Sequence, residues 1–145
     1  MEIITKKYNE LTLDELYGIL KIRNEVFVIE QNCPYLDIDG KDMVAYHVFA
    51  RDNDGICACL RVMADDSESG QALIGRVVTT KRRTGLGRQI MEEGIRTACN
   101  IFHTKRIRIE AQVQARGFYE KVGFVQSSEE FMLDGIPHIQ MRFAD

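Results

Sequence analysis

The segment with the clearest chemical potential in this 145-residue chain is RRTGLGR, residues 82–88. Three arginines surround two glycines there, just after an apolar run and at the start of a helical pattern. The first N–H groups of a helix lack hydrogen-bond partners and lie at the positive end of the helix dipole. Glycine lets the backbone approach a ligand closely, and guanidinium groups suit phosphate oxygens. The segment therefore predicts a site for a phosphate or a pyrophosphate.

Two familiar phosphate-binding patterns do not match this segment. A P-loop needs G-x-x-x-x-G-K-[ST], which is absent. A dinucleotide-binding turn would need a third glycine where the chain has Ile90, and it would belong to a βαβ unit. A nucleotide-phosphate transferase would need a magnesium-binding carboxylate near the turn, whereas residues 72–90 contain no Asp or Glu. A basic helix start, with glycines that serve only close packing, is the structural alternative.

A second segment, ARGFYEKVGF at residues 115–124, changes the interpretation of the first. Together with R-x-x-G-x-G at residues 82–87, it resembles the two motifs of the GNAT acetyltransferases, the second being A-x-x-x-Y-E-K-x-G-F. Residues 23–31, RNEVFVIEQ, and residues 39–42, DGKD, resemble the bacterial ElaA-like branch of that family. The resemblance covers nearly the whole chain, and two motifs in the family's order are more specific than one.

The resemblance implies an N-acetyltransferase that moves acetyl from acetyl-CoA to a primary amine by direct attack in a ternary complex. It implies that the backbone of residues 77–79 pairs with the pantetheine arm and that the amides of residues 83–88 hold the pyrophosphate. It places Gln112 near the pantetheine and Tyr119 beside the thioester sulfur. The acetyl-CoA contacts expected in this way are Val77, Val78, Thr79, Arg82, Arg83, Thr84, Gly85, Leu86, Gly87, Arg88, Gln112 and Phe118.

Acyl transfer to an amine needs a neutral amine, a stabilised oxyanion and a leaving thiolate. We expect Tyr119 to act as general acid on the thiolate and the N–H of Val78 to bind the thioester oxygen. Glu25, on the first predicted helix, is the hypothesis for the base, and a water relay is the alternative. Both side chains also have structural interpretations, as a packed tyrosine ring and a solvated helical glutamate. No cysteine lies in either motif, in agreement with direct attack.

Two positions depart from the family pattern. Arg83 replaces a common glycine in a turn that is short, since two residues separate Thr79 from Arg82. Arg76 is the charged residue in the region of the fourth strand where relatives often carry a glutamate. The path of the turn and the identity of the base therefore depend on the structure.

Other polar residues have structural as well as functional interpretations. The carboxylates of Asp37, Asp39 and Asp42 would attract a cationic amine, or they are turn formers in a solvated loop. Their spacing is a fragment of a calcium loop, but Val48 occupies the position of the required glutamate, so no calcium is expected. The four cysteines lack zinc-site spacing and are expected to be reduced thiols, so no metal is predicted. His138 is expected to orient the final strand.

The composition is that of one ordinary globular domain over residues 1–145, with 45% hydrophobic and 28% charged residues. The formal net charge of −3 argues against a nucleic-acid partner. No segment has the length of a membrane span or the pattern of a signal peptide, so we expect a cytoplasmic protein with no membrane partner. Exposed strands near the C-terminus would allow a homodimer.

The elements that must position these residues follow from hydrophobic periodicity and turn signals. Strands are predicted at residues 2–8, 45–51, 56–63, 72–80, 106–111, 124–133 and 138–143. Helices are predicted at residues 13–28, where Leu13 and Tyr17 belong to the apolar spacing, 85–102 and 115–121. With the resemblance, these elements predict a mixed α/β (α+β) class: a single GNAT-fold domain with a mostly antiparallel sheet flanked by helices. The alternative function is a non-catalytic CoA-binding sensor or interaction module.

Overall fold

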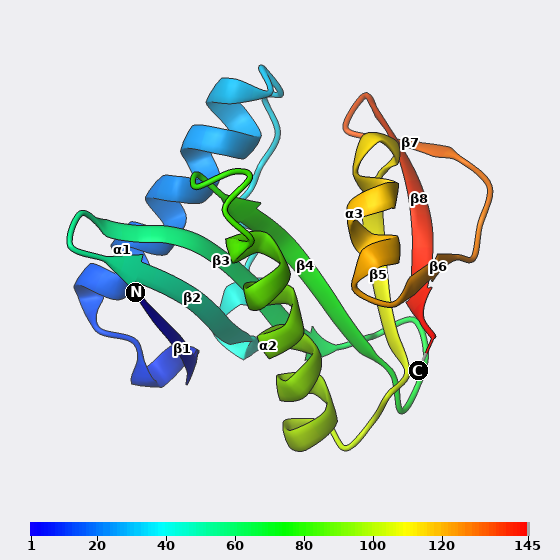
Figure 1. Cartoon of the computed structure of the whole chain (residues 1–145), viewed down its shortest axis with the longest axis horizontal. Coiled ribbons are helices and arrows are strands. Elements are labelled where there is room, and N and C mark those ends of the chain that lie inside the picture. The colour runs from blue at the N-terminus through cyan, green and yellow to red at the C-terminus, as the bar shows by residue number, and fades with distance from the viewer. Residues whose placement is uncertain (145) are drawn as a thin grey trace.

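The structure, a computed structural model, describes residues 1–144 of the chain. In this part of the chain, eight strands form one sheet in the order β1-β2-β3-β4-β5-β8-β6, and β7 also pairs with β8 (Figure 1). The strands are β1 (Glu2–Lys7), β2 (Tyr46–Asp52), β3 (Gly55–Ala64), β4 (Ala72–Thr79), β5 (Ile107–Gln112), β6 (Phe124–Gln126), β7 (Phe131–Leu133) and β8 (Ile136–Phe143). All neighbouring pairs are antiparallel except β4 and β5. The predicted mixed, mostly antiparallel sheet is confirmed.

Helices flank the sheet. Within residues 1–144 the α-helices are α1 (Leu13–Arg23), α2 (Leu86–Ile101) and α3 (Arg116–Lys121). A capping box starts α1: the Thr12 hydroxyl accepts the N–H of Glu15 at 3.1 Å, and the Glu15 carboxylate accepts the N–H of Thr12 at 2.8 Å. The chain then continues directly from α1 into a π-helix at Asn24–Glu30. Short 3-10 turns cover Tyr8–Glu10, Lys41–Val44 and Val113–Ala115.

The two longer helices cover opposite faces of the first half of the sheet, with α2 in front of it and α1 behind it in Figure 1. Val48 of β2 and Leu60 of β3 belong to the core cluster that contains Ile90 of α2. Their chain neighbours Phe49 and Cys59 point the other way, into the cluster with α1. Because side chains alternate along a strand and both faces are buried, these strands are apolar nearly throughout.

The first helix buries a different face from the one that Leu13 and Tyr17 suggested. Leu13 is 85% exposed and Tyr17 is 74% exposed, whereas Ile19, Ile22 and Val26 fill the core. The latter three residues also recur at helical spacing, and the π-helix adds a residue per turn that rotates the side chains following α1. The helix predicted at residues 13–28 is therefore present, but as two segments with another inner face.

The strand predicted at residues 124–133 is instead two short strands, β6 and β7, which pair with different parts of β8. Ser128 lies between them, and its hydroxyl accepts the N–H of Gln140 at 2.9 Å. A side chain thereby replaces the backbone partner of β8 at this point and interrupts the ladder. The prediction of one continuous strand was wrong because residues 127–130 lie opposite two residues of β8, 139 and 140, so the chain leaves the ladder there.

β4 and β5 diverge almost at once. Their parallel ladder contains two residue pairs, Ala72 with Ile107 and Leu73 with Arg108. Beyond these pairs the strands splay apart, so the sheet has two arms, β1–β4 and β5–β8 (Figure 1). The start of α2 and the end of the π-helix both lie toward the open end of this gap (Figure 1).

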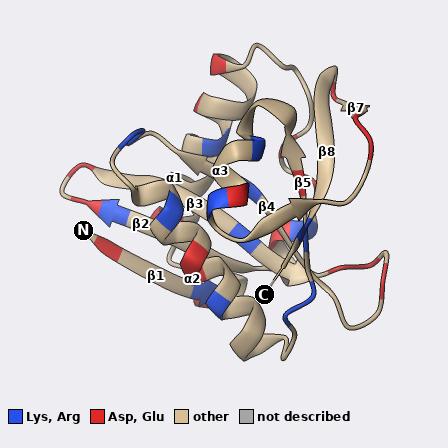
Figure 2. Ribbon diagram, turned by 45° about the vertical axis from the view of Figure 1, so that its right-hand side comes forward, with Lys and Arg blue, Asp and Glu red and all other residues tan. Residues whose placement is uncertain are grey.

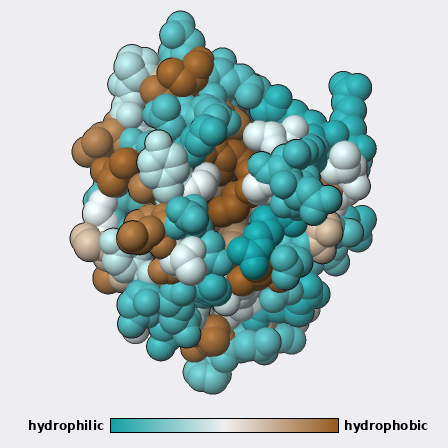
Figure 3. Space-filling model, turned by 90° about the vertical axis from the view of Figure 1, so that its left-hand side faces the viewer, coloured by the Kyte–Doolittle hydropathy of each residue, from teal (hydrophilic) through white to brown (hydrophobic). Residues whose placement is uncertain are grey.

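Positively and negatively charged residues are scattered over several elements (Figure 2). On the face shown in Figure 3, apolar side chains lie among hydrophilic ones. The four cysteines are free thiols, as predicted. Within residues 1–144 no helix is long and apolar enough to cross a membrane, and no three His, Cys, Asp or Glu side chains are grouped as metal ligands.

Candidate active site

The gap between the two arms contains a cleft of about 670 Å³. Its lining comes from β4 and β5, from α3, from the segment after the π-helix and from the turn between β7 and β8. Among the residues expected at the site, those that line it are Val77, Val78, Thr79, Arg82, Gln112 and Tyr119. Because ligand sites are concave clefts of this size, the cleft is the candidate active site.

β4 presents part of its backbone to the cleft. A bulge at Arg76, which has a φ of 52°, shifts the register against β3. After the bulge, the N–H of Thr80 donates to the Cys57 carbonyl of β3 at 2.9 Å. Successive N–H groups of a strand point to opposite sides, so this bond determines which amides of β4 face β3. The alternation directs the N–H of Val78 toward β3 and that of Thr79 toward the cleft. The expected role of the Val78 N–H conflicts with this geometry, because β3 already uses that group.

The turn after β4 leads into α2, where the Leu86 N–H donates to the Thr84 hydroxyl at 3.4 Å and the next two amides are free. Arg83 and Gly85 both have left-handed backbone conformations, with φ of 63° and 82°. No side chain caps the helix at Gly85, and the first bond of the helix runs from Gln89 N–H to the Gly85 carbonyl at 3.1 Å. The N–H groups of Gly87 and Arg88 have no acceptor among residues 1–144, and the first turn has no acidic residue. This arrangement can receive an anion.

The three arginines of the turn differ in their surroundings. Arg82 lines the cleft, and its guanidinium lies 2.6 Å from the Glu30 carboxylate at the end of the π-helix. Arg88 lies 3.7 Å from Glu92 within α2. Arg83 is exposed and holds the left-handed conformation typical of the glycine it replaces, at a cost of about 1–2 kcal/mol. The turn thereby keeps a glycine-like path and gains a charge available to a ligand.

Phe118 and the residues that begin α2 lie beside the cleft, outside its lining. Leu86 is buried in the core. A Cβ atom added to Gly87 would lie 3.3 Å from two atoms of the Phe118 ring, so the ring packs directly against the start of α2. Phe118, expected to contact the cofactor, forms a packing contact between α2 and α3 in this structure. Glycine at position 87 permits that close approach.

Tyr119 extends from α3 into the lining of the cleft. Its ring packs edge-on against Phe118, with centroids 5.0 Å apart, and against Phe124 at 6.2 Å. Burial raises the pKa of Tyr119 to about 12, so the hydroxyl stays protonated at neutral pH. The hydroxyl has no hydrogen-bond partner among the described residues and is free to donate to a ligand.

Two hydrogen bonds join the arms across the open end of the gap. Gln112, at the end of β5, donates from Nε2 to Gln31 Oε1 at 3.2 Å. The Cys33 thiol donates to the Asp134 carbonyl at 3.2 Å. All four residues line the cleft, so the segment after the π-helix forms part of its wall.

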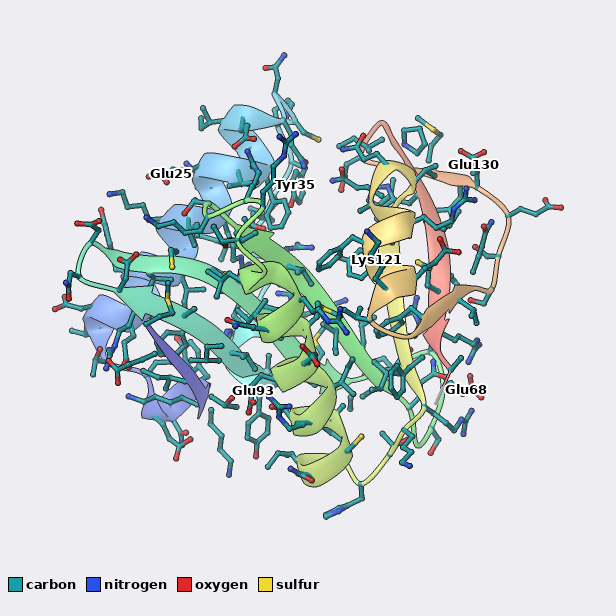
Figure 4. The ribbon with its side chains drawn as sticks, in the orientation of Figure 1. Glu25, Tyr35, Glu68, Glu93, Lys121 and Glu130 are labelled. Atoms are coloured by element: carbon teal, nitrogen blue, oxygen red, sulfur yellow. The ribbon has the colours of Figure 1, made fainter. Side chains whose placement is uncertain are left out.

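Glu25, the hypothesis for the base, does not reach the cleft. Its side chain is exposed on the π-helix, where a carboxylate oxygen lies 3.9 Å from Lys21 Nζ. Figure 4 shows this side chain on the side of the helix that faces away from the gap. The geometry therefore contradicts a role for Glu25 in deprotonating the amine.

The acidic residues of the long loop are paired with arginines. Arg23 of α1 lies 2.9 Å from Asp37 and 2.7 Å from Asp42, while Arg61 of β3 lies 2.7 Å from Asp39. Burial alone would raise the pKa of Asp39, but hydrogen bonds, first of all from Arg61, hold that pKa well below its usual range. The expected attraction for a cationic amine is not supported, because neighbouring arginines balance these charges. Asp39 does act as a turn former, since its carboxylate accepts the Lys41 N–H at 3.0 Å, whereas Asp37 and Asp42 are buried beside Arg23.

Arg76 joins this network from the cleft side. Its Nε lies 2.8 Å from an Asp37 carboxylate oxygen, and its guanidinium lies over the Tyr35 ring, 5.5 Å from the centroid. Tyr35 lies near the end of β4 (Figure 4), and burial raises the pKa of Tyr35 to about 12. Arg76 is therefore a guanidinium already paired with a carboxylate, and it supplies no base on β4.

His138 was not predicted as a cleft residue. It lies on β8 opposite Gln112 of β5 and lines the cleft. Its Nδ1 lies 2.7 Å from the Ile136 carbonyl oxygen. The register of β8 against β5 brings His138 to the cleft, and no local sequence pattern reveals that register.

A sheet that opens after a two-residue parallel pair, and whose free strand edge leads into the start of α2, is the architecture that the resemblance to the GNAT acetyltransferases predicts. The chain belongs to the acetyltransferase (GNAT) family, since the family model described as "Acetyltransferase (GNAT) domain" matches residues 15–144.

Its relatives place the chain in the ElaA-like branch. Protein ElaA of Escherichia coli (strain K12) is 36% identical over 138 residues, which cover 92% of this chain and 90% of that protein. The crystal structure of Escherichia coli ElaA superposes with a TM-score of 0.91 and 34% identity over 98% of both chains. An acyl-CoA N-acyltransferase from Pseudomonas aeruginosa gives a TM-score of 0.91 and 38% identity, over 99% of this chain and 100% of that one.

Proposed function

We propose that the protein is an acyl-CoA-dependent N-acetyltransferase that moves acetyl from acetyl-CoA to a primary amine by direct attack in a ternary complex. The observation that carries the proposal is the continuous path from the free edge of β4 to the uncapped start of α2. Thr79 offers backbone groups to the amides of the pantetheine arm. The N–H groups of Gly87 and Arg88, next to the Arg83 guanidinium, suit the pyrophosphate. Family membership supports the same reaction.

Acetyl-CoA, when bound, supplies an acetyl group activated as a thioester. The chain must then position the amine and the thioester, accept a proton from the amine nitrogen and donate a proton to the departing sulfur. Gln112 and Tyr119 line the wall of the cleft opposite β4, so a thioester at the edge of β4 would face them. Arg76 and Tyr35 also line the cleft.

Tyr119 is proposed as the proton donor to the departing sulfur. Its pKa of about 12 exceeds that of a free thiol, about 8.5, so complete transfer to a free thiolate would be uphill by about 5 kcal/mol. The hydroxyl therefore donates a hydrogen bond as the C–S bond breaks. Its proton follows when the ammonium nitrogen of the tetrahedral intermediate returns a proton to the tyrosine oxygen. The relay leaves a neutral amide and a neutral thiol.

Calorimetric titration with acetyl-CoA, with ATP and NAD as controls, tests the proposal. Saturable binding of acetyl-CoA alone is expected, and Arg83→Ala is expected to weaken it about tenfold through loss of a charged contact. Arg96→Ala, which removes an exposed arginine paired with Glu93 further along α2, is the matched control. Absence of acetyl-CoA binding would overturn the proposal. Binding without release of CoA in the presence of amines would favour the sensor or interaction module.

A further inference from the structure

The reaction proposed above still lacks a base. An alkylamine is largely protonated at neutral pH, with a pKa near 10.4 for a lysine side chain, and its lone pair can attack only after a proton leaves. Glu25 lies outside the cleft. Three acid–base groups of the lining are engaged elsewhere: Arg61 holds Asp39 at 2.7 Å, Arg108 holds Glu110 at 2.8 Å, and the Cys33 thiol donates to a carbonyl.

His138 has the geometry that a base requires. A carbonyl oxygen only accepts hydrogen bonds, so the 2.7 Å contact with Ile136 requires the proton of the neutral ring to be on Nδ1. The lone pair of the imidazole is therefore on Nε2. Stacking with Phe131, at 6.1 Å between centroids and 29° between planes, holds the ring in this orientation.

The Nε2 atom is open to the cleft. It has no hydrogen-bond partner among residues 1–144, and it is not one of the fully buried unpartnered side-chain atoms of these residues, so solvent reaches it. His138 lines the cleft and lies directly opposite Gln112 in the β5–β8 ladder. An amine that approaches a thioester held between β4 and Gln112 would therefore meet this lone pair.

We infer that His138 is the catalytic base, whose Nε2 takes a proton from the ammonium group of the acceptor; the inference rests on the proposed function. The N–H bond of the ammonium breaks as the Nε2–H bond forms, and the freed lone pair makes the C–N bond to the thioester carbon. The C–S bond then breaks, with Tyr119 as donor to sulfur. The imidazolium releases its proton to water, so one proton is produced per amide formed.

Two isosteric amines test this role. Ethylamine is protonated at neutral pH, whereas methoxyamine, CH₃–O–NH₂, is uncharged and needs no base before attack. His138→Asn keeps a side-chain N–H that can donate to the Ile136 carbonyl but removes the lone pair of Nε2. It is expected to lower kcat/KM about a hundredfold or more for ethylamine and less than about threefold for methoxyamine. Acetyl-CoA affinity is expected to stay within about twofold of the wild-type value.

Asp134→Asn is the matched control, because Asp134 also lines the cleft and the substitution replaces its carboxylate with a neutral amide of the same shape. Equal losses with both amines in His138→Asn would indicate a structural role and overturn the inference. A selective loss in Asp134→Asn instead would assign the base to the carboxylate and also overturn it. If the wild-type protein binds acetyl-CoA but acetylates neither amine, nor amino acids, polyamines or peptides, the proposed function fails and the inference fails with it.

Discussion

The two ends of the gap between β4 and β5 differ in whether their polar groups have hydrogen-bond partners within the protein. At the closed end, Arg108 and Gln71 each donate to Asp65 at 2.7 Å, and Arg142 donates to Gln71 at 2.8 Å. At the open end, the backbone edge of β4, the Tyr119 hydroxyl and Nε2 of His138 have no partner among the described residues.

This difference predicts that the closed end contributes mainly to folding stability and the open end mainly to the reaction. Buried polar groups are normally paired, and leaving one unpaired destabilises the fold. The closed end obeys this rule inside the protein, so its substitutions should affect folding. The open end leaves its groups to be paired by ligands, so its substitutions should affect reaction rates while the fold is retained.

Asp65→Ala is expected to give the largest effect. It removes the carboxylate that pairs with the largely buried Arg108, and breaking a buried ion pair costs about 3–5 kcal/mol. A loss near 3 kcal/mol is expected in urea unfolding, because Glu110 still lies 2.8 Å from Arg108. The double variant Asp65→Ala/Arg108→Met, which removes both charges, should recover part of the loss. Near-wild-type stability of Asp65→Ala would contradict the claim that the paired polar groups of the closed end stabilise the fold.

Tyr119→Phe should show the opposite profile. The hydroxyl makes no hydrogen bond with a described residue, so the free energy of unfolding should stay within about 0.5 kcal/mol of the wild-type value. Loss of a proton donor should lower kcat about a hundredfold with little change in acetyl-CoA affinity. Tyr17→Phe, at a 74% exposed position on α1, is the control. A Tyr119→Phe variant with lowered stability and a normal kcat would show that this open-end group serves stability and not the reaction.

Acid sensitivity gives a third test at the closed end. Burial alone would raise the pKa of Asp65, but hydrogen bonds from Arg108, Ser67 and Gln71 hold it well below its usual range. As pH falls below about 3.9, the unfolded chain therefore binds a proton that the folded protein does not, and stability decreases. In Asp65→Asn this decrease should be shallower by up to about 1.4 kcal/mol per pH unit. Urea unfolding between pH 4 and 2 measures the difference, and equal slopes would contradict it.

Gln31→Ala should give the smallest effect. It removes the bond to Gln112 across the gap, and a partly exposed hydrogen bond contributes about 0.5–1 kcal/mol. Gln114→Ala removes a bond of 3.0 Å to the same Gln112 from within one arm, and so is the matched control. Faster amide hydrogen exchange in the segment after the π-helix is expected only for Gln31→Ala. Equal effects would mean that the cross-gap bond has no special role.

The sequence predicted well those parts of the molecule that local chemistry determines. The strands of the first arm were found because apolar runs end at turn signals such as Asp54-Gly55, and α2 was found because its apolar residues have helical spacing. The open start of α2 follows from the glycine and arginine pattern of the preceding turn. Each of these features depends on residues close together in the chain.

The features that were missed depend on distant residues. The inner face of α1 is determined by its continuation as a π-helix and by Arg23, which reaches Asp37 and Asp42. No periodicity in the sequence reveals that pairing. His138 enters the cleft because β8 pairs with β5, and Glu25 is excluded because the π-helix turns it outward. Such placements require the three-dimensional register of the sheet.

The two-residue ladder between β4 and β5 has a mechanical consequence. Strand pairing joins the arms at the closed end, through two residue pairs. Toward the open end side chains join them instead, because Ile74 of β4 and Ile109 of β5 belong to one core cluster and Gln112 donates to Gln31 across the gap. The position of one arm relative to the other therefore depends on side-chain packing more than on backbone pairing.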